Sequence, residues 1–285
     1  MTTTTSTSTP TPTAGRRTSQ GLRPSLRRVG ALARAELRLL VRNRTALFNA
    51  LALPLLTVAL ITAVGGVGDG APDVVGPMLL NVLTLMALTF VVYYNLTVAY
   101  VARREELVLK RYLVGESSRA EILAGAAVPA VVVALTQSVL GVVGVSIFLE
   151  PPALVNPLLM VVAVAGGSVM LTALAAATSG LSRTVESAQL TTLPLLFVAL
   201  PFAGLFGGAA GGSSGVFDTI STFTPLRPIT DLMMLGATGL DRDGQVLSTF
   251  GETVAAGRLS VAVLVAWTAI GVLAARRWMR WEPRR

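Results

Sequence analysis

The chain of 285 residues contains no cysteine and no histidine, and its only lysine is Lys110. Without these side chains it has no thiol nucleophile, no disulfide, no Cys/His zinc site and no histidine-based catalytic triad. A Walker A loop needs a lysine after a glycine-rich turn, whereas Lys110 stands in the sequence VLKRY. The sequence therefore predicts no catalytic residue, no metal site and no nucleotide-binding motif, so the chain is not expected to be an enzyme.

Charged residues are also scarce: they make up 13% of the chain, against 53% hydrophobic residues and a mean hydropathy of +0.69. A typical soluble domain carries about 25% charged residues. Six apolar stretches approach the roughly 20 residues that a helix needs to cross a bilayer. They cover residues 45–67, 77–101, 122–149, 157–181, 188–207 and 259–275. The composition predicts an all-α membrane protein with six transmembrane helices.

The region before the first span divides into two parts. Residues 1–24 are rich in Thr, Ser and Pro and are expected to form a disordered cytoplasmic tail, while 25–285 form one transmembrane domain. Within 25–44, apolar residues recur at helical spacing and arginines fall on the opposite side. This pattern predicts an amphipathic helix in the membrane interface. A plain cytosolic extension of the first span is the alternative interpretation.

The positions of the basic residues predict the orientation. Twenty of the 23 Lys and Arg residues lie in the two termini and in the connections 102–121 and 182–187. Basic residues accumulate on the cytoplasmic side of membrane proteins. We therefore expect a multi-pass protein of the cell membrane with both termini in the cytoplasm. Because topology accounts for the basic composition, no nucleic-acid partner is predicted.

The stretch 216–235 is apolar, but Pro225 and Pro228 interrupt it, and a glycine-rich run at 207–215 precedes it. It is too short and too broken to span a bilayer. We expect a re-entrant or interfacial half-helix hairpin on the outer side before the last span. An acidic outer loop is expected to follow it at 241–257.

Polar residues inside the spans have two interpretations, which the sequence leaves open. They line a substrate path, or they form hydrogen bonds between helices, which contribute about 0.6 kcal/mol each. The candidates for the path are Asn81, Thr84, Tyr93, Asn95, Thr136, Gln137 and Thr172. No charged residue lies near the centre of a span, where ion-coupled carriers usually hold one.

The connection 102–121, ARREELVLKRYLVGESSRAE, carries nine charged side chains between the second and third spans. At the centre of a bilayer each would cost roughly 2.5–3.5 kcal/mol, so this segment must lie outside the hydrocarbon. The spacing of Glu106 and Lys110 is compatible with a short charged helix.

Two segments, ARAELRLLVRNRTALFNALALPLL and RREELVLKRYLVGESSRAEILAG, resemble ABC-2 type transporter permeases, in particular bacterial export subunits of the daunorubicin-resistance type. The resemblance covers about residues 30–280. Its more specific part is a charged R-E-x-x-x-L-K-R segment, a turn and a polar residue that enters the third span. These positions are occupied by Arg104, Glu105, Leu109, Lys110, Arg111, Ser118 and Glu121. The sequence GESS at 115–118 departs from many relatives, which have a more basic loop with a proline.

The resemblance implies a half-transporter that exports a drug, lipid, peptide or glycan. Two copies of the subunit, most simply a homodimer, form the pathway among membrane lipids. Two separate ATPase subunits bind on the cytoplasmic side and carry ATP and Mg, so this chain binds no cofactor. The implied coupling residues are Arg103, Arg104, Glu105, Glu106, Lys110 and Arg111, with Arg34, Glu36, Arg38 and Arg42 on the interfacial helix. A secondary carrier and a membrane anchor that recruits a cytosolic partner remain as alternatives.

Overall fold

The computed structural model describes residues 22–44, 72–107, 118–149, 151–204, 215–242, 244–279 and 281, and the positions 48, 52, 56, 59 and 60. In this part of the chain the elements are helical, apart from one isolated β-bridge between Leu240 and Val246. Among the described residues, four helical segments are long and apolar enough to cross a membrane: Val75–Glu105, Arg119–Phe148, Pro157–Ser179 and Phe250–Trp278. The all-α membrane class is confirmed. The predicted first span at 45–67 lies largely outside the described residues, so the count of six spans stays a prediction.

The second predicted span is one continuous helix with an irregular centre. It consists of α3 (Pro72–Met86), the π-helix η1 (Ala87–Tyr94) and α4 (Asn95–Glu105). A π-helical turn is wider than an α-helical turn and is often found at functional sites. At its end the backbone N–H of Asn95 is shared between the carbonyls of Phe90 and Val92. The irregular part of this span therefore lies midway along its length.

The third, fourth and last predicted spans are each one long helix. They are α6 (Arg119–Phe148), α7 (Pro157–Ser179) and α11 (Phe250–Trp278). The last helix starts at Phe250 rather than at residue 259, because Thr249 and Glu252 form a capping box at its start. The expected acidic loop at 241–257 is therefore wrong in its second half, where the chain is helical.

The fifth predicted span is shorter than expected. α8 (Val185–Ala199) ends before Pro201, which begins the short 3-10 helix η2 (Pro201–Ala203), whereas the prediction placed the span at 188–207. At 1.5 Å per residue, 15 residues measure about 22 Å, which is less than the roughly 30 Å of a hydrocarbon core. By itself α8 does not cross a bilayer.

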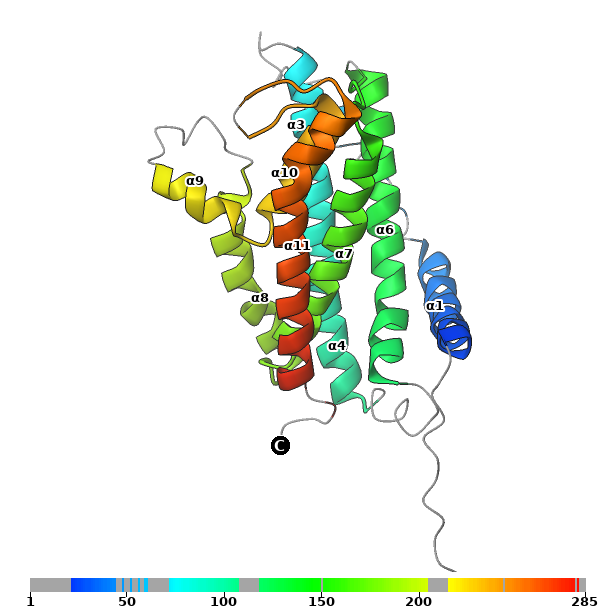
Figure 1. Ribbon diagram of the computed structural model, residues 1–285. Coiled ribbons are helices and arrows are strands. Elements are labelled where there is room, and N and C mark those ends of the chain that lie inside the picture. The colour runs from blue at the N-terminus through cyan, green and yellow to red at the C-terminus, as the bar shows by residue number, and fades with distance from the viewer. Residues whose placement is uncertain are drawn as a thin grey trace, which may run out of the picture.

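The long helices form an elongated bundle (Figure 1). α11 packs against α7, and α6 packs against α3 and η1. In Figure 1 the upper end of the bundle holds the starts of α3, α7 and α11. The lower end holds the end of α4, the start of α6, the turn at 180–184 and the end of α11.

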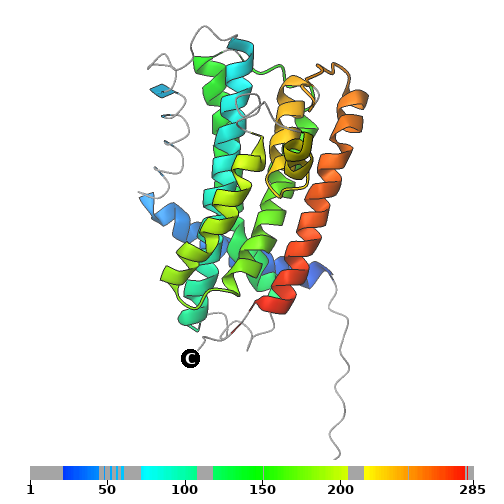
Figure 2. The same ribbon diagram turned by 90° about the vertical axis from the view of Figure 1, so that its left-hand side faces the viewer.

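The predicted amphipathic helix is present as α1 (Leu22–Arg42), which begins three residues earlier than the expected 25–44. It runs across the lower half of α6, transverse to the long helices (Figures 1 and 2). Ala33 is buried, and Leu32 lies so close to Gly125 of α6 that a Cβ there would come within 2.7 Å of the Leu32 Cβ. The apolar side of α1 therefore packs on protein, at a position where α6 has no side chain.

The apolar stretch before the last span forms two short helices, α9 (Gly215–Thr222) and α10 (Arg227–Thr238). Pro225 lies in the turn between them, and Pro228 lies in the first turn of α10, where its missing N–H is not needed. The two prolines that interrupt the sequence pattern thus mark the turn and the start of the second helix.

The position of α10 along the bundle follows from its contacts. Near its start, Ile229 contacts Gly167, which lies midway along α7. Near its end, Gly236 lies against Met160, in the first turns of α7. The indole N–H of Trp267 in α11 donates to the carbonyl of Phe223 at 2.8 Å. The hairpin turn therefore lies at about half the height of the bundle, and α10 rises from there to the upper end.

Candidate functional site

At the lower end, an ion pair attaches α1 to the start of α6. One carboxylate oxygen of Glu121 accepts hydrogen bonds from Nε and Nη2 of Arg28 at 3.3 and 3.2 Å. The other oxygen accepts the backbone N–H of Ser118 at 2.7 Å, and the Ser118 hydroxyl accepts the N–H of Glu121. Glu121 thus caps α6 and anchors α1 at once. Its carboxylate is buried, with donors on both oxygens.

A second ion pair attaches α1 to the end of α4. Nη2 of Arg103 lies 2.8 Å from Oε1 of Glu36, and each side chain is 21% exposed. The segment 108–117, which connects α4 to α6, lies outside the described residues. Both helices that lead into it are nevertheless tied to α1. We refer to the pairs Arg28–Glu121 and Glu36–Arg103 as the α1 brace.

Arg104, the next residue, contacts a different part of the lower end. Nη1 donates to the carbonyl of Ser179 at 2.9 Å, and Nη2 donates to the carbonyls of Ser182 and Arg183 at 2.6 and 3.4 Å. These carbonyls belong to the end of α7 and the turn to α8, where helical partners are absent. The Arg104 side chain is only 1% exposed. In this chain the Arg104 guanidinium therefore positions the turn between α7 and α8, and its role in coupling to a partner stays a prediction.

The other predicted coupling residues divide between the surface and the undescribed segment. Glu105 and Glu106 are exposed at the end of α4. Lys110 and Arg111 lie outside the described residues. On α1, Glu36 is paired as described, whereas the remaining predicted side chains of that helix, Arg34, Arg38 and Arg42, are exposed.

The C-terminal segment after α11 also lies at the lower end. A Cβ on Gly180, in the turn after α7, would overlap the carbonyl oxygen of Trp278. Met279 is buried, and the Arg119 guanidinium lies 5.4 Å from the ring centroid of Trp281, within reach of a cation–π contact. The chain end thus contacts both the turn after α7 and the start of α6.

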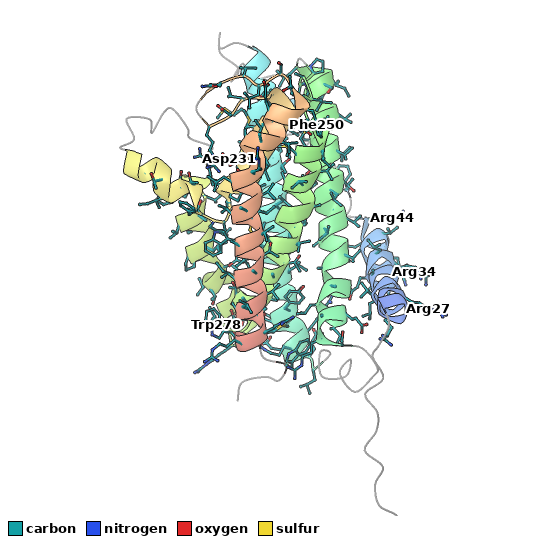
Figure 3. All side chains as sticks on the ribbon, in the orientation of Figure 1. Arg27, Arg34, Arg44, Asp231, Phe250 and Trp278 are labelled. Carbon is teal, nitrogen blue, oxygen red and sulfur yellow. The ribbon has the colours of Figure 1, made fainter. Side chains whose placement is uncertain are left out.

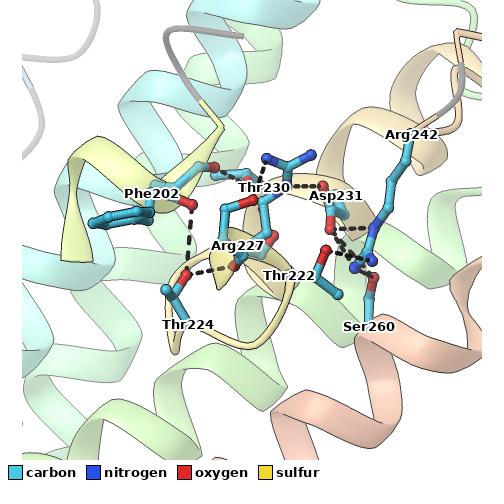
Figure 4. A network of polar contacts seen from close by, with 10 residues as sticks. Phe202, Thr222, Thr224, Arg227, Thr230, Asp231, Arg242 and Ser260 are labelled. Carbon is cyan, nitrogen blue, oxygen red and sulfur yellow. Dashed lines mark hydrogen bonds and ion pairs between the residues drawn. The ribbon is translucent and has the colours of Figure 1, made fainter. Parts of the chain in front are cut away.

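The upper half contains a cluster of charges that sequence reasoning missed (Figure 4). Asp231 of α10 pairs with Arg227 through Oδ1 at 2.7 Å and with Arg242 through Oδ2 at 2.6 Å. Arg242 also donates to the hydroxyls of Thr222 and Ser260 at 3.3 and 2.9 Å. The side chains of Arg227, Asp231 and Arg242 are 13–23% exposed. This Arg–Asp–Arg cluster joins α9, α10, the loop after α10 and α11.

The turn before α10 is held by further hydrogen bonds (Figure 4). The Thr230 hydroxyl donates to the carbonyl of Ala203, and the Thr224 hydroxyl donates to the carbonyls of Ser221 and Phe202 at 2.7 and 3.5 Å. η2 and the α9–α10 hairpin are therefore linked. In the part of the chain that the structure describes, no group of His, Cys, Asp and Glu side chains is arranged to hold a metal ion.

A comparison with protein-family models matches residues 27–236 to the ABC-2 type transporter family. This range runs from α1 to α10 and covers more than half of the 285 residues. The chain belongs to the ABC-2 type transporter family. It is accordingly the membrane-spanning permease part of an ABC transporter. A search of curated proteins finds no match.

The polar residues proposed for a substrate path differ in their burial in this ABC-2 permease. Asn81, Thr84 and Tyr93 are buried, and the Tyr93 hydroxyl lies 3.2 Å from that of Thr178. By contrast, Asn95 is exposed. The hydroxyl of Thr136 donates to the carbonyl of Val132 in its own helix.

Two further path candidates of the permease, Gln137 and Thr172, are partly buried on α6 and α7. Across the whole candidate set, the contacts favour helix packing at Tyr93 and Thr136. Asn81, Thr84 and Thr172 each have a buried oxygen without a hydrogen-bond partner among the described residues. These three are the candidates with polar atoms left for a path, and the roles of Asn95 and Gln137 stay predictions.

Proposed function

We propose that this chain is the transmembrane permease subunit of an ABC exporter, driven by ATP that a separate ATPase subunit hydrolyses. The permease assignment follows from the family. The proposal adds the ATPase partner, the export direction, the daunorubicin-resistance-like subtype and a substrate class of drug, lipid, peptide or glycan.

The observation that carries the proposal is the α1 brace on both sides of the segment 108–117. In the proposed exporter, this segment contacts the ATPase subunit through residues that include Lys110 and Arg111. A contact loop transmits motion only if its ends are attached to elements that move with it. Arg103 and Glu121 supply these attachments, because each forms an ion pair with α1. Exposed Glu105 and Glu106 add charges that favour one register of a partner over another.

The orientation in this proposal puts the lower end in the cytoplasm. The excess of basic residues in the chain ends and in the connections at the lower end supports it. The upper end, with the α9–α10 hairpin, then faces outward. The hairpin turn at half-height and the buried start of α10 support a re-entrant hairpin, because irregular backbone at membrane depth is tolerated where protein buries it.

The assembly we propose contains two permease copies and two ATPase subunits, with ATP and Mg on the ATPases. Within the described part of the chain, α6 and α11 leave large parts of their apolar surfaces uncovered. Lipid and a second copy are the occupants that a membrane offers to such faces. We infer a homodimer as the simplest assembly that provides two coupling loops for two ATPases.

A charge-swap experiment tests the coupling role of the brace without knowledge of the substrate. Glu36→Arg and Arg103→Glu each place like charges opposite one another, whereas the double variant restores an attractive pair. We expect each single variant to lower the permease-dependent stimulation of ATPase activity at least fivefold, and the double variant to recover most of it. Arg258→Gln, at an exposed arginine near the upper end, is the matched control.

Membrane insertion and expression are measured in parallel, by the yield of folded permease in mild detergent. Single variants that insert normally and stimulate the ATPase like the wild type would contradict the coupling role. If no ATPase copurifies with the wild-type permease even after gentle cross-linking, the exporter proposal itself fails. A secondary carrier or an anchor for a cytosolic partner would then be favoured.

A further inference from the structure

One face of α1 forms no ion pair within the described part of the chain, and Arg34 only donates Nε–H to the carbonyl of Gly30 in its own helix. Five arginines, Arg27, Arg34, Arg38, Arg42 and Arg44, are exposed along this helix and its end. None of the five pairs with a described carboxylate. Glu36 is the only acidic residue in 22–44, and it is engaged by Arg103.

The orientation of this face follows from the attachment of α1 to the bundle. The side of α1 that contacts α6 carries Ala33, Leu32 and Arg28. Figure 3 shows Arg34 on α1 and Arg44 just beyond its end extending away from α6. Two apolar side chains next to the arginines are also exposed, Leu39 at 62% and Val41 at 61%. We call the exposed side chains Arg34, Arg38, Leu39, Val41 and Arg42 the arginine face.

The height of the arginine face decides which occupant fits it. Trp278 at the end of α11 has an aromatic ring of the type that marks the headgroup zone. In Figure 3, Arg27 lies at about the height of Trp278, and Arg34 and Arg44 lie higher, toward the middle of the bundle. A soluble subunit would lie below the helix ends. At the height of Arg34, beside the spans, the surroundings of a membrane protein are lipid.

We propose that the arginine face binds the headgroups of anionic phospholipids, with Leu39 and Val41 against the acyl chains. A helix that lies along the membrane plane and exposes both arginines and aliphatic side chains fits the boundary between lipid headgroups and acyl chains. Arginine pairs with phosphate through several N–H donors at once. The arginines reach the phosphates while their stems cover apolar surface.

This inference differs from the coupling proposal in both residues and partner. The α1 brace uses Arg28 and Glu36, which pair with Glu121 and Arg103 of the bundle, whereas lipid binding uses the exposed side chains of the arginine face. It is therefore tested on the purified permease alone, without an ATPase. A failure of the exporter proposal would leave the lipid result unchanged.

The test is a titration of the permease in nonionic detergent micelles with phosphatidylglycerol, or with phosphatidylcholine as the neutral probe. Native mass spectrometry counts the lipids retained on the protein. Each arginine near an anionic surface contributes about a fivefold increase in affinity. We therefore expect the triple variant Arg34→Gln, Arg38→Gln, Arg42→Gln to bind phosphatidylglycerol about a hundredfold more weakly.

Two controls identify the source of the effect. The triple variant Arg34→Lys, Arg38→Lys, Arg42→Lys keeps the charge and is expected to stay within about threefold of the wild type. Arg258→Gln removes an exposed arginine near the upper end and is expected to bind as the wild type does. If the triple glutamine variant is poorly folded, the three single variants are compared, each with an expected loss of about fivefold.

Unchanged phosphatidylglycerol binding in the glutamine variants would overturn the proposal. The proposal would also be wrong if the wild type retained phosphatidylcholine as well as phosphatidylglycerol, because binding would then not depend on the charge of the headgroup. Loss of ATPase copurification with unchanged lipid binding would identify the arginine face as a protein contact instead.

Discussion

The two ends of this permease use charged residues in opposite ways. In the upper half, Asp231 holds two arginines in a cluster that also engages hydroxyl groups of α9 and α11, so these charges link elements of the fold to one another. At the lower end, two ion pairs link α1 to the helices on either side of one connection, and the neighbouring Glu105 and Glu106 remain exposed at the surface. The comparison suggests that the upper charges fix one arrangement of helices, while the lower charges leave surface for partners.

The largest effect is expected at the upper end. Asp231→Ala leaves Arg227 and Arg242 without their shared carboxylate in a partly buried site. Removal of one partner of a buried ion pair costs about 3 kcal/mol. We expect the free energy of unfolding, measured by titration with a denaturing detergent, to fall by about that amount.

Two variants sharpen this prediction. Asp231→Asn keeps one oxygen acceptor and should lose about half as much stability. Glu252→Gln keeps the capping box at the exposed start of α11 and should stay within about 0.5 kcal/mol of the wild type. If Asp231→Ala were as stable as Glu252→Gln, the cluster would not hold the hairpin to α11.

Within the lower end, neighbouring arginines provide an internal comparison. Arg104→Met removes a buried charged donor from the carbonyls of Ser179 and Ser182, which should cost about 2 kcal/mol in unfolding free energy. Arg103→Met removes only a partly exposed ion pair, which should cost about 0.5 kcal/mol. Arg104→Lys should lie between them, because an ammonium lacks the planar fork of donors. Equal losses at 103 and 104 would contradict the distinct roles given to them.

The smallest effect is expected for the Glu36–Arg103 pair of the α1 brace. A double-mutant cycle with Glu36→Gln and Arg103→Gln should give a coupling free energy of about 0.5 kcal/mol, since each side chain is 21% exposed. A coupling above about 2 kcal/mol would mean that this pair stabilises the fold as strongly as the upper cluster does. The contrast between the two ends would then not hold.

Much of the fold could be predicted from the sequence, because long apolar runs and capping residues are local signals. The second, third, fourth and last spans appear where the apolar runs lie, and the two prolines mark the hairpin. The end of α8 was missed because the apolar run continues past Pro201 while the helix does not. The start of α11 was missed because the capping residues Thr249 and Glu252 precede the apolar run.

The candidate site was predictable only in part. Arg104 looked like its charged neighbours, yet the buried residues Tyr93, Thr97 and Tyr100 already define a helical face on which Arg104 falls. That spacing was the available signal for its burial. Arg227 and Asp231 are four residues apart, which was also a local signal. By contrast, the contact between Asp231 and Arg242 depends on how the loop folds back, and no local pattern encodes it.

The most direct test of the central claim uses the absence of cysteine from this chain. Two single-cysteine variants, Glu106→Cys at the lower end and Val246→Cys at the upper end, are both at exposed positions. Each is labelled with a short photo-cross-linker in native membranes, and the cross-linked products are identified by mass spectrometry. We predict that an ABC ATPase cross-links to the Glu106→Cys variant and not to the Val246→Cys variant. Cross-linking of the ATPase only through the upper-end variant, or through neither, would contradict the assignment of the lower end as the coupling surface.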